Sequence, residues 1–89
     1  MLFIYPKYLG LPIIPSRTAM NELMMCDLAL EDVAEVLETG FDCSRSARKE
    51  GTLERCVKRG KKTLKVVVVK SVNYTLSTEC WVLTHAGVF

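Results

Sequence analysis

Two segments in the first half of the chain place apolar residues at intervals of three and four, the spacing of one face of a helix. In the first segment, Met20, Leu23 and Met24 recur on one side. Ser16 precedes it, and a serine oxygen accepts hydrogen bonds from amides that the first helical turn leaves unpaired. The pattern predicts a helix over residues 17–26.

The second segment has the clearest pattern in the sequence and predicts a helix over residues 28–39. Asp27 stands at the capping position, and Gly40 is predicted to end the helix in the left-handed conformation. The side facing away from the apolar positions is acidic, and it is either a solvated surface or a docking surface for a basic partner. The apolar positions are Leu30, Val33, Ala34 and Leu37, and the acidic ones are Glu31, Asp32, Glu35 and Glu38.

After Gly40 the pattern becomes that of strands. Residues 52–57 alternate weakly, and residues 64–69 are dense in β-branched side chains. Between them, residues 59–62 contain a glycine and read as a turn. These features predict a β-hairpin.

The last part of the chain predicts one further strand. The polar residues 71–78 indicate a loop or a second turn, and residues 80–85 a strand with Trp81 and Leu83 on its buried face. Residues 16–89 therefore predict a single α+β domain, in which two N-terminal helices precede an antiparallel sheet of about three strands.

The first fifteen residues are rich in apolar side chains but are interrupted by Pro6, Pro12 and Pro15. We expect residues 1–15 to form an extended arm, laid across the domain or exchanged in a homodimer. The interruptions leave no run of about 20 apolar residues that would span a bilayer. Lys7 is the only early charge, unlike the basic start of a secretory signal, so we expect a cytoplasmic protein with no membrane contact.

The cysteines and glycines favour neither a metal nor a cofactor. The four cysteines, Cys26, Cys43, Cys56 and Cys80, form no CxxC pair, and there is a single histidine. The thiols are interpreted as small, mostly buried apolar groups. The alternative is a disulfide across adjacent strands, such as one between Cys56 and Cys80. The five glycines are isolated, which argues against a phosphate-binding loop.

Charge is distributed very unevenly along the 89 residues. Residues 1–44 hold two basic and seven acidic side chains, whereas residues 45–70 hold ten basic and two acidic ones. A cluster of this density attracts polyanions, and nucleic acid is the favoured partner. The candidate contacts are Arg45, Arg48, Lys49, Arg55, Lys58, Arg59, Lys61, Lys62 and Lys65.

The basic block contains no aromatic residue between Arg45 and Lys70. Proteins that read single-stranded bases usually supply aromatic stacking platforms, so this composition favours contacts to the backbone over base readout. The alternative interpretation is a solvated turn whose lysines keep an edge strand from aggregating. A further alternative is a protein-interaction domain, in which the acidic helix of one copy meets the basic hairpin of another.

His85 is the only conventional general base in the chain. Thr84, Cys80 and Cys43 are candidate nucleophiles beside it. The alternative for a single histidine in a terminal strand is a structural or solvent-facing role.

The run from Thr18 to Thr84 resembles a family of small uncharacterised bacterial and archaeal domains related to the RelE/ParE-type toxins. The resemblance rests on the acidic helix 31–40 (EDVAEVLETG), the valine-rich segment 65–70 and the closing segment 81–84 (WVLT). Thr18-Ala19 stands where the family has His-Ala, Glu22 where it has its first arginine, and Cys26-Asp27-Leu28 where it has Arg-Gly-Ile.

The resemblance implies a RelE/ParE-like fold and RNA or gyrase as the target, because the related toxins are ribosome-dependent ribonucleases or gyrase poisons. For this chain it offers a ribonuclease as an alternative to a binding domain. In that alternative His85 acts as acid or base, and Arg48 and Arg55 stabilise phosphate charge.

Overall fold

The computed structural model describes residues 5–43, 51–75 and 77–88. Within them the chain forms two helices and six strands. In order these are β1 (Lys7–Tyr8), β2 (Leu11–Pro15), α1 (Arg17–Met25), α2 (Leu30–Thr39), β3 (Phe41–Asp42), β4 (Thr52–Arg59), β5 (Lys62–Asn73) and β6 (Thr78–Val88).

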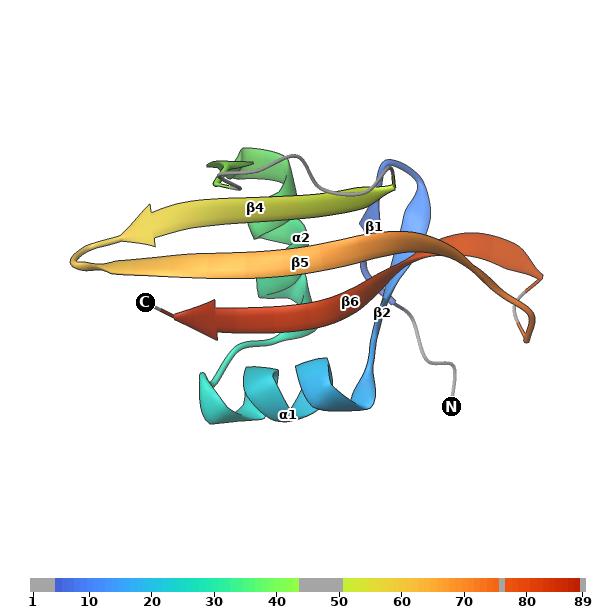
Figure 1. Cartoon of the computed structure of the whole chain (residues 1–89), viewed down its shortest axis with the longest axis horizontal. Helices are drawn as coiled ribbons and strands as arrows, with labels where there is room; N and C mark the ends of the chain where they lie inside the picture. The colour runs from blue at the N-terminus through green and yellow to red at the C-terminus, as the bar shows by residue number, and fades with distance from the viewer. Residues whose placement is uncertain (1–4, 44–50, 76, 89) are drawn as a thin grey trace.

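The strands form one sheet in the order β1-β2-β6-β5-β4-β3. Strand β2 runs parallel to β6, and every other neighbouring pair is antiparallel. Helix α2 lies behind the centre of the sheet, and α1 lies along the free edge of β6, past the point where β2 ends (Figure 1). The sheet therefore has one face covered by α2 and one face turned away from it.

This mixed six-stranded sheet contradicts the predicted fold, a RelE/ParE-like domain in which two helices precede an antiparallel sheet of about three strands. The error lies mainly in residues 7–15, which form β1 and β2 where an arm was expected, and Ile13 of β2 is completely buried. The prolines are compatible with these strands because Pro12 lies in the edge hairpin and Pro15 ends its strand. Because β2 pairs with β6 about 70 residues later, no local pattern could reveal it.

The core lies between α2, α1 and the covered face of the sheet. Leu64, Val66 and Val68 of β5 point into it at the period of two that a strand imposes. Trp81 and Leu83 join them from β6, which confirms the buried face predicted for that strand. The Trp81 indole Nε1 donates a hydrogen bond to the Tyr8 carbonyl oxygen at 3.0 Å, so burying the ring leaves no donor unpaired.

The helix starts are partly as predicted. The Ala19 amide donates to Ser16 Oγ at 3.1 Å, which confirms Ser16 as the cap of α1. Helix α2 begins later than predicted, because Asp27 adopts a left-handed conformation with φ of 55° and Ala29 takes the capping position. The Asp32 carboxylate accepts from the Ala29 amide at 2.9 Å and satisfies this helix start instead.

Gly40 ends α2, but not by the predicted left-handed conformation. Its φ of −77° and ψ of 177° are extended values that other residues adopt. A Cβ at this position would lie 2.6 Å from the Cys56 carbonyl oxygen and would also collide with the Val36 carbonyl oxygen. The glycine is therefore required by the close approach of α2 to β4.

The predicted β4–β5 hairpin is present, and Arg59 pairs with Lys62 across a two-residue turn. Gly60 occupies the first turn position with φ of 62°, a value that glycine adopts without steric cost. A β-bulge shifts the register of β5 against β6, so that Val67 pairs with His85 and Val68 with Leu83. Among the described residues, no helix combines the length and the apolar character needed to cross a membrane.

Candidate nucleic-acid interface

The predicted basic residues of the hairpin divide between the two faces of the sheet. Arg55 pairs with Val66, whose side chain points into the core, so Arg55 faces the helices. Lys65 is one residue away from Val66 in the same strand and faces the opposite side. The basic hairpin residues that the structure describes therefore do not form one continuous ridge.

Arg55 holds together the junction between α2 and β3. Its Nη1 donates to the Gly40 carbonyl oxygen at 3.2 Å, and its Nε lies 3.4 Å from Asp42 Oδ1. The arginine side chain is 26% exposed, whereas that of Asp42 is 78% exposed. These contacts bind the guanidinium to its own chain and turn it away from the outer face.

Lys65 lies on the face of the sheet that is turned away from α2, which we call the outer face, and its Nζ is 2.9 Å from Glu54 Oε1. The Glu54 side chain is only 4% exposed, and Glu54 is the one buried charged residue in the described part of the chain. A buried carboxylate is stable only when it is paired, so Lys65 has a structural task here. Lys70 similarly lies 3.5 Å from Glu79, but both side chains are about half exposed.

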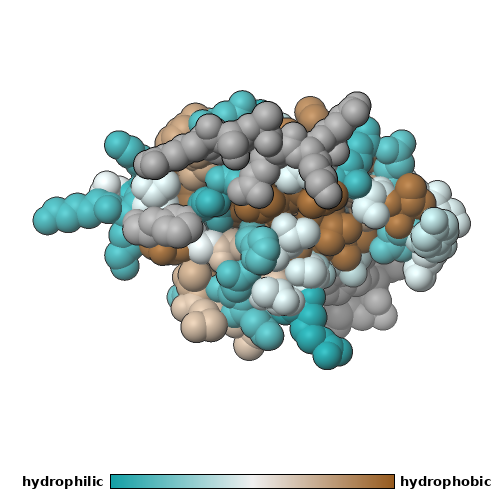
Figure 2. Space-filling view, in the orientation of Figure 1, coloured by the Kyte–Doolittle hydropathy of each residue, from teal (hydrophilic) through white to brown (hydrophobic). Residues whose placement is uncertain are grey.

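The β4–β5 turn, in contrast, presents four exposed basic residues: Lys58, Arg59, Lys61 and Lys62. We call these four the hairpin tip. Arg59 Nη2 lies 3.6 Å from Glu35 Oε2 in a largely exposed pair. The three lysines form no ion pair with any described residue. The turn projects at one end of the sheet (Figure 1), and hydrophilic side chains extend from that end in the space-filling view (Figure 2).

A groove of about 420 Å³ lies beside the hairpin tip, between the end of α1 and the ends of β5 and β6. It combines apolar walls with the two cations Arg59 and Lys62. Its lining residues are Met25, Cys26, Leu28, Arg59, Lys62, Leu64 and Val88. Sequence reasoning missed this groove because its lining comes from three segments that are distant in the sequence.

Three predicted contacts, Arg45, Arg48 and Lys49, lie in the segment 44–50, outside the described residues. The structure therefore places six of the nine predicted contacts. Four of the six gather at the hairpin tip, while Arg55 and Lys65 are engaged in the ion pairs described above.

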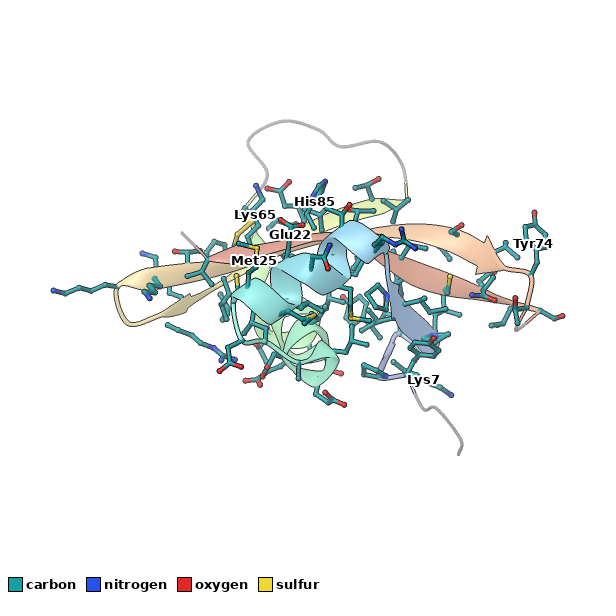
Figure 3. All side chains as sticks on the ribbon, turned by 90° about the horizontal axis from the view of Figure 1, so that it is seen from below. Lys7, Glu22, Met25, Lys65, Tyr74 and His85 are labelled. Atoms are coloured by element: carbon teal, nitrogen blue, oxygen red, sulfur yellow. A yellow bond between two sulfur atoms is a disulfide. The ribbon has the colours of Figure 1, made fainter. Side chains whose placement is uncertain are left out.

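His85 lies on the outer face of the sheet, opposite to the face that carries Arg55. Its Nδ1 is 3.3 Å from Glu22 Oε1 of α1, and the imidazole is 65% exposed. Figure 3 shows His85 and Lys65 on the same side of the sheet, with Glu22 close to the imidazole. The two strand faces thus separate His85 from Arg55, one of the two arginines predicted to assist it, and the other, Arg48, lies outside the described residues.

The predicted nucleophiles beside His85 are occupied or enclosed. The Thr84 hydroxyl donates to the Val67 carbonyl oxygen at 3.2 Å. Cys43 is bonded to Cys56, and Cys80 is buried. Burial also raises the pKa of the Cys80 thiol, which keeps it protonated and unreactive at neutral pH.

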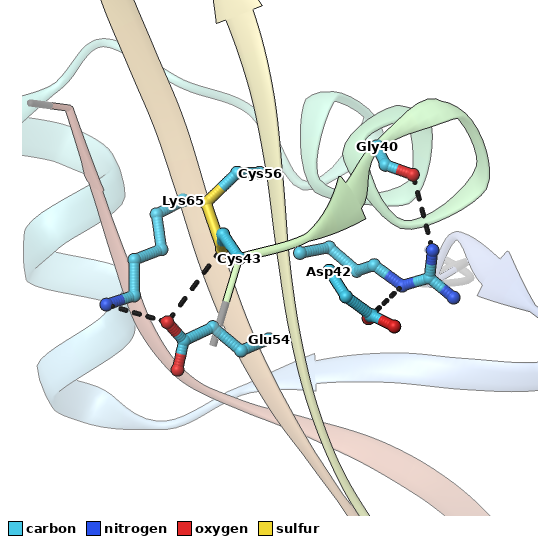
Figure 4. The surroundings of a disulfide bond; sticks show 7 residues. Gly40, Asp42, Cys43, Glu54, Cys56 and Lys65 are labelled. Carbon is cyan, nitrogen blue, oxygen red and sulfur yellow. Dashed lines mark hydrogen bonds and ion pairs between the residues drawn. A yellow bond between two sulfur atoms is a disulfide. The ribbon is translucent and has the colours of Figure 1, made fainter. Parts of the chain in front are cut away.

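The Cys43–Cys56 disulfide corrects the interpretation of the cysteines as mostly buried thiols, and it gives Cys56 another partner than the one named in the alternative of a disulfide across adjacent strands. It joins the residue after β3 to the neighbouring strand β4, with 5.8 Å between the Cα atoms, a normal separation for this bond. The alternative pairing of Cys56 with Cys80 is not present, since Cys80 and Cys26 are free. Figure 4 shows Glu54 and Lys65 next to the bond.

Comparison with known proteins adds no relative: no family model, no curated protein and no solved structure matches the chain. The class that the geometry itself defines is a small mixed-sheet domain with an exposed cationic turn.

Proposed function

We propose that this protein is a small binding domain whose hairpin tip contacts the phosphate backbone of nucleic acid. The observation that carries the proposal is the contrast within one hairpin. The lysines of the tip are exposed and form no ion pair with a described residue, whereas Arg55 and Lys65 are each held by a carboxylate. Unpaired, exposed cations at a protruding turn are the kind of group that displaces counterions from phosphates.

Contact to the backbone is favoured over base readout because stacking groups are far from the tip. Tyr74 is 90% exposed, but it lies at the β5–β6 turn, at the other end of the sheet (Figure 3). Trp81 is in the core. RNA is the favoured nucleic acid, because toxins of the RelE/ParE type, which the sequence resembles, include ribonucleases.

The test is a fluorescence-anisotropy titration of the protein with labelled RNA and DNA at two salt concentrations. Three phosphate contacts predict that affinity for a duplex falls by about 40-fold between about 50 and 200 mM salt, and by about 20-fold for a single strand. Saturable binding with this salt dependence supports the proposal. Absence of binding at the lower salt concentration contradicts it.

A toxin-type ribonuclease is the second candidate, and the Glu22–His85 pair is the observation that favours it. A carboxylate beside an imidazole fixes the orientation of the ring, as general acid–base catalysis requires. If the protein is a toxin-type ribonuclease, its expression should arrest growth, the purified protein should cleave RNA, and His85→Ala should abolish both effects. Normal growth and intact RNA count against it and leave the binding proposal standing.

A further inference from the structure

The disulfide lies beside the buried carboxylate of Glu54 on the outer face of the sheet. Cys56 is 3% exposed, whereas Cys43 is partly exposed and is the more accessible of the two residues. Glu54 precedes Cys56 by two residues on β4, so both side chains point to the same face. Glu54 Oε1 lies 3.8 Å from Cys43 Sγ and 2.9 Å from Lys65 Nζ, as Figure 4 shows.

The contact between Glu54 and Cys43 has a different meaning in each redox state. A sulfur atom in a disulfide carries no proton, so it cannot donate a hydrogen bond to the carboxylate. After reduction, the Cys43 thiol has an acceptor already in place at 3.8 Å. In the disulfide form, the Glu54 carboxylate is paired with Lys65 through the same oxygen atom, Oε1. The fold therefore already offers an acceptor to one of the two thiols that reduction creates, that of Cys43.

We propose that Cys43 and Cys56 form a reversible thiol–disulfide exchange site whose substrates are thiols and disulfides, with Glu54 as the proton acceptor for Cys43. In reduction, a substrate thiolate attacks Cys43 Sγ, and the electrons of the broken S–S bond leave on Cys56 Sγ, which takes a proton from water. A second substrate thiolate attacks the substrate sulfur of the mixed disulfide and releases Cys43, which also becomes protonated. Two substrate thiols are oxidised to one disulfide, and the protein disulfide is reduced to two thiols.

In the reverse direction Glu54 accepts the Cys43 proton, and the thiolate attacks a substrate disulfide and expels one thiolate. Cys56 then loses its proton to water and attacks Cys43 Sγ, which restores the protein disulfide and releases the second substrate thiolate. Lys65 holds the carboxylate in place and balances its charge. Attack begins at Cys43 because Cys56 is enclosed by the sheet.

The test uses the full chain with Cys26→Ser and Cys80→Ala, so that thiol labels report only the disulfide pair. Oxidised protein is equilibrated in buffers of reduced and oxidised glutathione, and the labelled fraction is measured by mass shift under native conditions. Reversible conversion while the circular-dichroism spectrum stays folded supports the proposal. A disulfide that resists millimolar dithiothreitol until the protein unfolds overturns it.

The role of Glu54 is tested by the rate at which oxidised glutathione reoxidises the reduced protein. Glu54→Gln keeps the shape of the side chain but cannot take the proton, and the rate is expected to fall by at least about tenfold near neutral pH. The matched control is Glu79→Gln, which removes the carboxylate of another lysine pair, on β6, and leaves the rate unchanged. If Glu54→Gln reoxidises as fast as the wild type, the assignment of Glu54 is wrong.

Glu54→Gln also removes the carboxylate that lies 2.9 Å from Lys65 Nζ, so a second variant keeps the test usable if that protein unfolds. The double variant Glu54→Gln, Lys65→Gln replaces the ion pair with two amides of similar size. It is expected to show the same slow reoxidation in a folded protein. A wild-type rate in this variant overturns the proposed proton transfer.

Discussion

The hairpin tip and the middle of the same hairpin carry similar basic side chains in different environments. At the tip, Lys58, Lys61 and Lys62 are exposed and form no ion pair within the described residues. In the middle, Arg55 is bound to Gly40 and Asp42, and Lys65 to the buried Glu54. The proposed contact to phosphates is therefore assigned to the tip, whereas the basic residues of the middle are engaged by groups of the fold itself.

This contrast shows that the number of basic residues in a segment does not measure the charge available to a partner. The carboxylates that engage the middle of the hairpin come from β3 and from the hairpin itself. Strand register decides these partners, since it determines which side chains share a face. The predictions below separate the two regions, beginning with the largest expected effect.

Removing the three lysines of the tip should nearly abolish nucleic-acid binding. The triple variant Lys58→Ala, Lys61→Ala, Lys62→Ala is expected to lose at least about 100-fold in affinity at low salt, since three phosphate contacts disappear. Its free energy of unfolding should change by less than about 0.5 kcal/mol, because the side chains are exposed. Anisotropy and urea denaturation measure the two quantities.

Lys70→Ala is the matched control, because Lys70 is also an exposed lysine of β5 but lies outside the tip and is paired with Glu79. It should bind nucleic acid within about threefold of the wild type, a change typical of weak long-range charge effects. Equal losses in the triple variant and in this control would show that only total charge matters, which contradicts the distinction between the two regions.

Lys65→Ala should have the opposite profile. It removes the ammonium group that lies 2.9 Å from the buried Glu54 carboxylate and is expected to lower the free energy of unfolding by about 1–3 kcal/mol. Nucleic-acid affinity of the folded protein should change little. A variant that is as stable as the wild type but binds RNA much more weakly would place Lys65 in the interface.

Glu35→Gln sharpens the comparison by releasing the one tip cation that has a partner. Arg59 loses its pair at 3.6 Å, and nucleic-acid affinity is expected to rise by about two- to threefold. Stability should change by less than about 1 kcal/mol, since the pair is largely exposed. Glu38→Gln on the same helix controls for the net charge. A larger rise in that control would place the effective charge elsewhere.

The two free cysteines provide the smallest effect and extend the same contrast between exposed and enclosed groups. Burial raises the pKa of the Cys80 thiol above its ordinary 9.0, whereas Cys26 is partly exposed. Iodoacetamide should therefore label Cys26 first, with Cys80 protected until the protein unfolds, as measured by mass spectrometry. Rapid labelling of Cys80 in the folded protein would contradict this order of labelling.

Burial of the neutral Cys80 thiol also makes stability depend on pH. Because the folded pKa is raised, its contribution to the free energy of unfolding is present below pH 9.0 and is lost as pH rises beyond it.

Local pattern was sufficient for the features that depend on neighbouring residues. The start of α1 at Ser16, the β4–β5 hairpin and its charged turn, and the buried face of β6 all follow from such patterns. The end of α2 did not, because the need for glycine at residue 40 comes from the Cys56 carbonyl oxygen on another strand. The position of β2 and the partner of Cys43 are equally non-local.

The candidate site shows the same limit. The tip cations can be found in the sequence because a two-residue turn keeps them adjacent. The pairing of Lys65 with Glu54 depends on register, and the pairing of His85 with Glu22 joins residues 63 positions apart. The β-bulge also helps to place His85 on the outer face of the sheet. Its extra residue is Thr84, and nothing in the local sequence marks Thr84 as a bulge position.

The most direct test of the central claim is the slope of the logarithm of the RNA association constant against the logarithm of salt concentration, compared between the wild type and Lys61→Ala. The account predicts that removing one phosphate contact makes the slope shallower by about 0.7 to 0.9, while Lys70→Ala leaves it unchanged. An identical slope in Lys61→Ala and the wild type would show that the hairpin tip does not contact the backbone.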